Sequence, residues 1–143
     1  MTQFAQSCEL CVPQPDPVWR NDELSVILVD DANYPGFCRV IWHDHVQEMS
    51  DLTPAQRVAF MDVVNHVELA QRAVLQPDKI NLASLGNVVP HLHWHVIPRF
   101  RDDAHFPSPV WAAAVRTLDP AILAARRALL PALSAAIVQR LNS

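Results

Sequence analysis

Pro90-His91-Leu92-His93-Trp94-His95-Val96-Ile97-Pro98-Arg99 is the stretch of sequence that most constrains the fold of this chain. Its histidines alternate with apolar residues, and successive side chains of a β-strand point to opposite faces of the sheet. The pattern predicts a strand over residues 91–98 that turns His91, His93 and His95 to one exposed surface. The apolar residues between them face the other way and can pack against a helix.

Three interpretations of these histidines remain open from the pattern itself. Ordinary packing explains a lone histidine, but it poorly explains three at strict alternation out of seven in the chain. A single metal ion would reach two neighbours but hardly all three, because His91 and His95 lie about 13 Å apart along an extended strand. Nucleophilic catalysis uses all three, since a neutral imidazole is a nucleophile and its neighbours can bind or protonate a phosphate and its leaving group.

Composition excludes several other classes of protein. The 143 residues are 50% hydrophobic, enough for one domain with a packed core. Gly36 and Gly86 are the only glycines, so a glycine-rich phosphate loop cannot be built, and Lys79 is the only lysine. A net charge of −4 argues against binding a nucleic-acid polymer. Apolar runs such as 110–115 are too short to span a membrane, and residues 1–10 do not resemble a signal peptide, so we expect a cytoplasmic protein with reduced thiols.

The remaining elements follow from turn residues and periodicity. Residues 24–29 and 37–42 are β-rich runs that predict an antiparallel hairpin. Thr53-Pro54 predicts the start of a helix that ends at Gln76-Pro77. Two further strands, 79–85 and 91–98, are joined around Gly86. A last helix begins at Asp119-Pro120 and is broken or kinked at Pro131. The absence of regular βαβ alternation favours an α+β fold with an antiparallel sheet.

Cys8-Glu9-Leu10-Cys11 supplies half of a zinc ligand set. A closed structural site needs four ligands, so the pair is by itself a weak signal, and the alternative is two reduced, partly buried cysteines. A thioredoxin-like redox role is disfavoured because no βαβ pattern surrounds the pair. Cys38 lies in an apolar strand and is interpreted as a core residue.

The alternating histidines, followed by Val96-Ile97, resemble the signature of the histidine triad (HIT) superfamily of nucleotidyl hydrolases and transferases. Residues 37–42, 45–48 and 86–91 also resemble segments of that family, so that the resemblance covers residues 20–101. It implies a single domain over 1–143, with a Cys-containing head (1–19), a core (20–101) and a C-terminal tail with helices (102–143). It further implies a five-stranded antiparallel sheet with one long helix, and a homodimer whose two sheets join edge to edge, a pairing that would also cover an exposed sheet edge.

The resemblance assigns the chemistry to the three histidines. His93 would attack the α-phosphate of a small-molecule nucleotide and form a covalent nucleotidyl-histidine, which water then hydrolyses. His95 would contact the phosphate and help the leaving group, and His91 would support the placement of His93 or bind a metal. The substrate would be a dinucleoside polyphosphate, a nucleoside phosphoramidate or an adenylylated adduct. No cofactor is required for this chemistry.

Further positions follow from the same resemblance. Asp30 matches the residue that holds the ribose hydroxyls, and Asn87 stands where many members carry a phosphate-binding Gln. Arg99 and Trp111 complete the expected nucleotide-binding set, although a turn aspartate, a sheet-edge arginine and a core tryptophan are the plain structural alternatives. A structural zinc would be held by Cys8, Cys11, His45 and His91, with His43 as the alternative to His45. Arg39 departs from the family, which usually has an apolar residue there, and a buried arginine needs an acidic partner.

Two rival functions fit the same sequence. One is a zinc-dependent hydrolase that uses the histidine strand as its metal site. The other is a nucleotide-binding protein that keeps the fold without catalysis.

Overall fold

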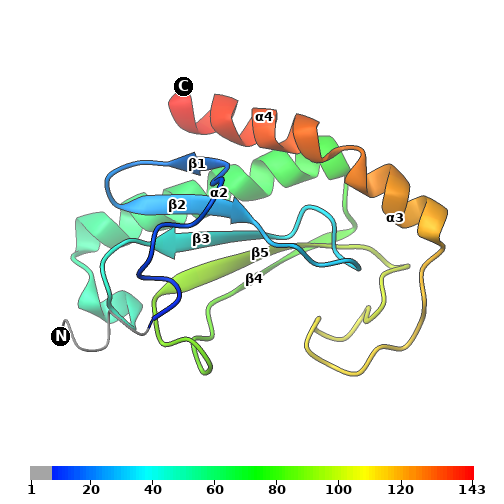
Figure 1. Ribbon diagram of the computed structural model, residues 1–143, viewed down its shortest axis with the longest axis horizontal. Coiled ribbons are helices and arrows are strands. Elements are labelled where there is room, and N and C mark those ends of the chain that lie inside the picture. The colour runs from blue at the N-terminus through cyan, green and yellow to red at the C-terminus, as the bar shows by residue number, and fades with distance from the viewer. Residues whose placement is uncertain (1–7) are drawn as a thin grey trace.

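A five-stranded antiparallel sheet carries the histidine segment in this computed structural model, which describes residues 8–143. The strand order is β1-β2-β3-β5-β4, which places the histidine strand inside the sheet (Figure 1). The predicted α+β class and antiparallel sheet are confirmed. The edge-to-edge continuation of the sheet into a second copy stays a prediction. The strands are β1 (Trp19–Arg20), β2 (Leu24–Leu28), β3 (Cys38–Trp42), β4 (Lys79–Ala83) and β5 (His93–Arg99).

The strand register sets which side chains meet on each face. β2 and β3 form the predicted hairpin, with Val26 opposite Val40. β5 pairs with β3, so that Arg39 lies opposite His95 and Ile41 lies opposite His93. Val40 and Val96 are fully buried in the main core, on the face covered by α2. The alternate residues of β3 and β5 therefore share the other face of the sheet.

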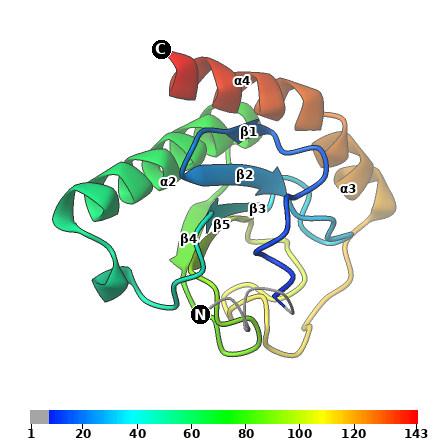
Figure 2. The same ribbon diagram turned by 60° about the vertical axis from the view of Figure 1, so that its left-hand side comes forward.

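Helix α2 (Pro54–Leu75) covers the core face of the sheet (Figure 2). It begins as predicted: Thr53 accepts a hydrogen bond from the Gln56 backbone N–H, and the Gln56 side chain returns to the Thr53 backbone. Gln76 ends the helix in the left-handed conformation, with φ 51°. Val74 of the predicted apolar stripe is partly buried, and the other members are buried in the main core: Phe60, Val63, Val64, Val67 and Ala70.

The C-terminal helices are α3 (Pro120–Arg127) and α4 (Leu130–Asn142), and the break before Pro131 confirms the predicted interruption. α4 packs along α2 and buries Leu133 and Ile137 completely. The segment Pro120–Asn142 is long and apolar enough to cross a membrane, with a mean hydropathy of 1.6, which the sequence reading did not anticipate. Leu133 and Ile137 of α4 are buried, but only 11% of the most apolar window of this segment is buried inside the structure.

Some predicted boundaries are wrong. β5 begins at His93, not at residue 91, and β4 ends at Ala83 instead of continuing to residue 85. Before β5 the backbone N–H of His91 donates to Val89 and that of Leu92 to Val46, so this segment makes loop contacts outside the strand ladder. The short β1 and the turn η1 (Met49–Asp51) were not predicted. Residues 1–7 of the predicted head lie outside the described residues.

Candidate functional site

His93 and His95 lie side by side on the sheet face that α2 leaves uncovered. Their ring centroids are 4.9 Å apart, with the planes at 88°. The edge of Phe37 packs against His95, at 5.6 Å between centroids. This pair keeps the alternation that the sequence predicted, and it brings two imidazoles within reach of one phosphate group.

The hydrogen bond of His93 defines its tautomer. Its Nδ1 contacts the backbone carbonyl oxygen of His91, which can only accept, so Nδ1 carries the proton. The lone pair of a neutral His93 ring is therefore on Nε2. Burial lowers the pKa of His93, and the nearby charge of Arg39 lowers it further, partly offset by the hydrogen bond to His91 and by Glu9. At neutral pH His93 is thus an unprotonated ring with a free nucleophilic nitrogen.

His95 is also neutral at pH 7. Burial lowers its pKa to about 4, and His93 and Arg39 add to that effect. Its Nδ1 is buried and meets no hydrogen-bond partner within residues 8–143. A nitrogen left without a protein partner beside a nucleophile is suited to meeting a ligand atom.

His91 does not join the other two rings, which corrects the prediction of three imidazoles on one exposed surface. Its Nε2 donates to the Trp42 carbonyl oxygen, so Nδ1 carries the lone pair. That Nδ1 lies 3.5 Å from Cys8 Sγ, 3.4 Å from Cys11 Sγ and 3.3 Å from His45 Nδ1. His91 is 1% exposed and His93 6%, so both are buried, and their Nδ1 atoms meet different groups: the cysteines and His45 for His91, and the His91 carbonyl oxygen for His93.

Cys8, Cys11, His45 and His91 form a cluster that could hold a metal ion, with all four ligand atoms within 4.8 Å of one another. Ligands of a tetrahedral zinc ion with bonds of about 2.0–2.3 Å stand roughly 3.5 Å apart. The Cys11 Sγ–His45 Nδ1 distance of 3.1 Å and the three His91 distances above are close to that spacing. Burial and the neighbouring Cys8 raise the pKa of Cys11 to about 11, a shift that a bound cation would reverse. The donor set therefore fits a closed metal site.

His43, the alternative ligand, is engaged elsewhere. Its Nε2 is 2.7 Å from the Ser25 hydroxyl and its Nδ1 is 3.0 Å from the Asp22 carbonyl oxygen. His45 thus completes the cluster, and His43 does not.

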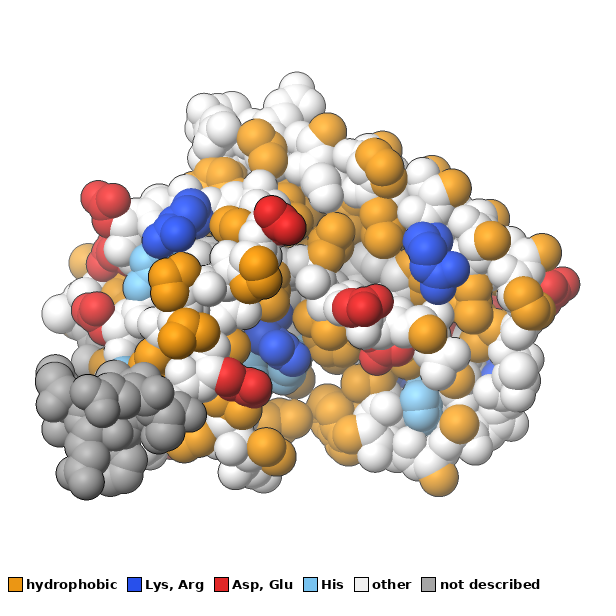
Figure 3. Space-filling view, in the orientation of Figure 1, with side chains coloured by type: hydrophobic (Ala, Val, Ile, Leu, Met, Phe, Trp, Pro, Cys, Tyr) orange, Lys and Arg blue, Asp and Glu red, His pale blue; other side chains and the backbone are white. Residues whose placement is uncertain are grey.

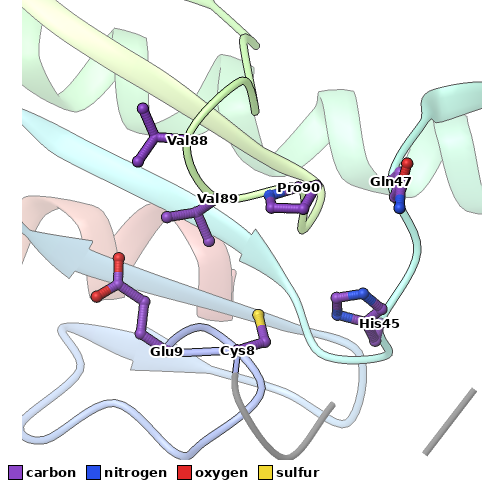
Figure 4. Close-up of a pocket in the computed structure, with 7 residues that line it drawn as sticks. All are labelled: Cys8, Glu9, His45, Gln47, Val88, Val89 and Pro90. Atoms are coloured by element: carbon purple, nitrogen blue, oxygen red, sulfur yellow. The ribbon is translucent and has the colours of Figure 1, made fainter. Parts of the chain in front are cut away.

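A pocket of about 380 Å³ lies beside the metal cluster and not over His93 and His95 (Figure 4). Cys8 and Glu9 form one wall and the loop before β5 forms another. Its lining residues are Cys8, Glu9, His45, Gln47, Val88, Val89 and Pro90. Glu9 was not singled out in the sequence, although its position between the two cysteines places it near the site.

Arg99 is a structural residue, which corrects its assignment to nucleotide binding. Its side chain is 2% exposed, and Nε donates to Asp103 Oδ2 at 2.7 Å. Nη1 donates to Asn81 Oδ1 at 2.7 Å, and Nη2 donates to the Ser108 carbonyl oxygen at 2.6 Å. Four of the five guanidinium N–H groups already donate to protein acceptors and the side chain is buried, which favours a structural role over phosphate binding.

The other predicted nucleotide ligands are accessible. Asp30 is exposed two residues after the end of β2, and Asn87 is exposed in the loop before β5. Trp111 is 59% exposed in the segment that follows β5, which argues against a core role. No hydrogen bond links any of the three to His93 in the described part of the chain, so their roles stay predictions.

Arg39 lies on the same face as His93 and His95. Its Nε is buried without a hydrogen-bond partner in the described region. Burial lowers the pKa of Arg39, and the charge of Glu9 acts in the opposite direction. Glu9 is thus the acidic group that acts on Arg39, although no ion pair within 4.0 Å joins Arg39 to any of residues 8–143.

Comparison with known proteins agrees with this architecture. A family model described as the HIT domain matches residues 14–102. A histidine triad protein from Bradyrhizobium japonicum is 30% identical, with a TM-score of 0.66 over 82% of this chain and 88% of that one. A HIT protein from Sinorhizobium meliloti 1021 is 25% identical, with a TM-score of 0.68 over 87% of each chain.

A Zn-bound histidine triad family protein from Mycobacterium smegmatis shares the fold at 23% identity, with a TM-score of 0.64 over 94% of this chain and 96% of that one. A comparison with curated proteins gave no match. The family model spans more than half of the chain and agrees with the histidine pattern, the sheet and the long helix. The chain belongs to the HIT family.

Proposed function

We propose that this protein is a nucleotide hydrolase or nucleotidyl transferase that acts at a substituted α-phosphate through a covalent nucleotidyl-His93 intermediate. The observation that carries the proposal is the hydrogen bond from His93 Nδ1 to the His91 carbonyl oxygen. It leaves the Nε2 lone pair free on a neutral ring, beside a second neutral imidazole, His95. A positioned, unprotonated imidazole is the nucleophile that such a mechanism needs.

The reaction proceeds by two displacements. His93 Nε2 attacks the α-phosphorus, a P–N bond forms, and the bond from phosphorus to the leaving group breaks with its electron pair on the leaving group. Water, or an acceptor in the transfer reaction, then attacks phosphorus, breaks the P–N bond and returns the imidazole. His95 contacts the phosphoryl oxygens, where negative charge builds in each step. Asp30 holds the ribose, and Asn87 and Trp111 contact the nucleotide.

We further propose that Cys8, Cys11, His45 and His91 hold a structural zinc ion. The four ligands leave no open coordination position, which is typical of structural and not of catalytic zinc. Such an ion stabilises the fold and ties the Cys8–Cys11 segment to His91, the residue whose carbonyl oxygen orients His93. The spacing of the donor atoms supports this proposal, as does the zinc bound by the M. smegmatis protein.

We also propose a soluble cytoplasmic homodimer. β4 is paired on one side only and carries the exposed side chain of Leu82, 41% accessible, with Leu85 following at 52%. An unpaired edge strand with apolar side chains favours pairing with another strand. Light scattering of the purified protein at two concentrations would test this; a monomer at both would contradict it.

The decisive experiment uses an adenosine 5′-phosphoanhydride labelled at the α-phosphate. Rapid quenching in denaturant during turnover should trap label on the protein as an acid-labile adduct, and His93→Ala should remove both the adduct and turnover, by about 10³-fold or more. His66→Ala is the matched control, because His66 lies on α2 and pairs with Asp62 instead of entering the site. Turnover without trapped label, or near-normal turnover by His93→Ala, would overturn the mechanism.

A further inference from the structure

We propose that Arg39 forms an anion subsite beside His93 and His95, and that this subsite makes the enzyme prefer phosphoanhydride substrates, whose leaving group is a phosphate, over phosphoramidates. The preference rests on the proposed function and narrows its substrate class. The subsite itself rests on the position and surroundings of Arg39.

The strand register places Arg39 next to both catalytic imidazoles. Its Cα lies opposite that of His95, and His93 is the diagonal neighbour on the same face. Directly opposite residues in an antiparallel pair are about 5 Å apart and diagonal ones about 7–8 Å, distances that an arginine side chain spans. The charge of Arg39 acts on both rings, which agrees with this closeness.

The polar atoms around the imidazoles lack protein partners. Arg39 Nε and His95 Nδ1 are both buried without a hydrogen bond to any described residue. Burying such groups unpaired is costly, so they favour a ligand that supplies acceptor oxygens. Figure 3 shows blue and pale-blue side chains next to one another beside a hollow near the middle of this face. A phosphate group offers several oxygens to a guanidinium and an imidazole at once.

Glu9 partly compensates the charge of Arg39 without forming an ion pair with its guanidinium. Its carboxylate acts on both Arg39 and His93 electrostatically, yet it forms no ion pair with Arg39 within 4.0 Å. Glu9 is exposed and lies at the wall of the pocket beside the metal cluster (Figure 4). The guanidinium therefore stays free to bind an incoming anion.

The chemistry of the leaving group determines which substrate reacts faster because of Arg39. An amine leaves phosphorus only after its nitrogen gains a proton, and a guanidinium does not release one. His95 is neutral in the free enzyme, because burial lowers its pKa to about 4, so at pH 7 it is not the imidazolium that acts as an effective proton donor. A phosphate leaves as an anion with the P–O electron pair and needs no proton. Arg39 stabilises the charge that accumulates on its oxygens as that bond breaks.

The test compares two substrates of the same nucleoside, diadenosine triphosphate and adenosine 5′-phosphoramidate. Arg39→Leu should lower kcat/KM for the anhydride by about 10- to 100-fold, the usual loss for a charge-assisted contact. It should change the phosphoramidate rate by less than about threefold. Arg39→Lys, which keeps the charge, should recover part of the anhydride rate. Equal losses on both substrates would show that Arg39 only supports the histidines, and would overturn the proposal.

A binding measurement separates failure of the subsite from failure of the proposed function. In a His93→Ala background, adding Arg39→Leu should weaken binding of ADP by about tenfold and leave adenosine unchanged, as measured by calorimetry. Unchanged ADP affinity would overturn the subsite. If the wild-type protein turned over neither substrate while Arg39→Leu still weakened ADP binding, the proposed reaction would fail and the anion subsite would stand.

Glu9→Gln should change ADP affinity in the direction opposite to Arg39→Leu. Removing the carboxylate leaves the charge of Arg39 uncompensated, so ADP should bind about two- to fivefold more tightly. Weaker binding of ADP to Glu9→Gln would contradict the subsite, because it would mean that Glu9 orients Arg39 instead of competing with the anion. Thermal unfolding of each variant checks that the fold is kept.

Discussion

Arg99 and Arg39 lie on neighbouring strands and on the same face of the sheet, yet their surroundings are opposite. Arg99 donates to Asp103 at 2.7 and 3.1 Å, to Asn81 and to the Ser108 carbonyl oxygen. Arg39 has a buried Nε without an acceptor among residues 8–143. Arg99 is bonded into the fold, and Arg39 is the residue for which we propose an anionic ligand.

Asp103 explains why the first cation is closed to ligands. It accepts from Arg99 and from the backbone N–H groups of Phe100, His105 and Phe106. These bonds fix the turn that follows β5. Asp103, supplied by the segment after β5, thus compensates the charge of Arg99, whereas no described segment supplies such a partner to Arg39.

The largest expected effect is on stability and distinguishes the two arginines. Arg99→Met should lower the free energy of unfolding by about 3–5 kcal/mol, because Asp103 is left buried without its cation. Arg39→Met should cost less than about 1 kcal/mol, since no protein acceptor loses its donor. Urea unfolding of both variants measures the difference. Equal losses would mean that Arg39 also has a structural partner, and the contrast between the two residues would be wrong.

Like Arg39, the metal cluster consists of side chains suited to bind a ligand from outside the chain. Loss of its metal should have the second-largest effect on stability. With zinc at about 100 times its Kd, binding to the folded state alone stabilises a protein by about 2.7 kcal/mol. Chelation should therefore lower the unfolding temperature of the wild-type protein, and added zinc should restore it. Cys11→Ala should abolish this response.

His43→Gln is the matched control for the cluster, because His43 is bonded to Ser25 and Asp22 and not to the cysteines. It should keep the zinc response of the wild type. Elemental analysis of the purified protein gives the stoichiometry directly. No zinc in protein purified with the metal present would remove the cluster from the proposal.

Most of the helices and strands could be predicted from patterns among residues that are close in the sequence. Thr53, Pro54 and Gln56 define the start of α2 through a hydrogen-bonding pattern that depends on neighbours in sequence, so it could be predicted. The alternation at His93 and His95 likewise reflects the two faces of a single strand. The cysteine pair with His45 and His91 could be proposed only through the family resemblance, because those residues are 34 to 83 positions apart.

The partners of Arg99 and the position of His91 could not be read from the sequence. Arg99 and Asp103 are four residues apart, but their contact depends on how the chain turns after β5, which no periodicity specifies. His91 follows the alternation yet lies outside the strand, because its backbone N–H donates to Val89 and that of Leu92 to Val46; of their backbone groups, only the Leu92 carbonyl oxygen bonds to β3, through Trp42. Both the partners of Arg99 and the position of His91 depend on tertiary contacts of loops.

A smaller effect tests how far the Arg99 network extends. The Tyr34 hydroxyl donates to Asp103 Oδ1 at 3.2 Å and lies 2.6 Å from His105 Nδ1. Tyr34→Phe removes these bonds without removing the buried ring, so it should cost about 0.5–1.5 kcal/mol of unfolding free energy. In an Arg99→Met background the cost should change, because both residues act on Asp103. Strict additivity would place Tyr34 outside the network.

The smallest expected effect is the pH-dependent contribution of His95, on the sheet face that α2 leaves uncovered, to the free energy of unfolding. The pKa of His95 is about 4 in the folded protein, because of burial and the charges of His93 and Arg39, and 6.5 is its ordinary value. Between these values the unfolded chain binds a proton that the folded protein does not. The contribution of His95 is therefore complete above pH 6.5 and is lost as the pH falls toward 4. Because the ring is only partly buried, we expect a loss of about 1 kcal/mol.

Arg39→Met should lessen that acid sensitivity, since removing the neighbouring cation lets His95 accept a proton nearer its ordinary pKa. Unfolding free energies of the wild type and Arg39→Met at pH 7, 6 and 5 measure the change, with Arg72→Met on α2 as a charge-matched control away from the histidines. If both variants followed the wild-type pH dependence, the guanidinium of Arg39 would not act on His95. A flatter curve for Arg39→Met alone would show an uncompensated cation next to the imidazoles, the property that separates Arg39 from Arg99.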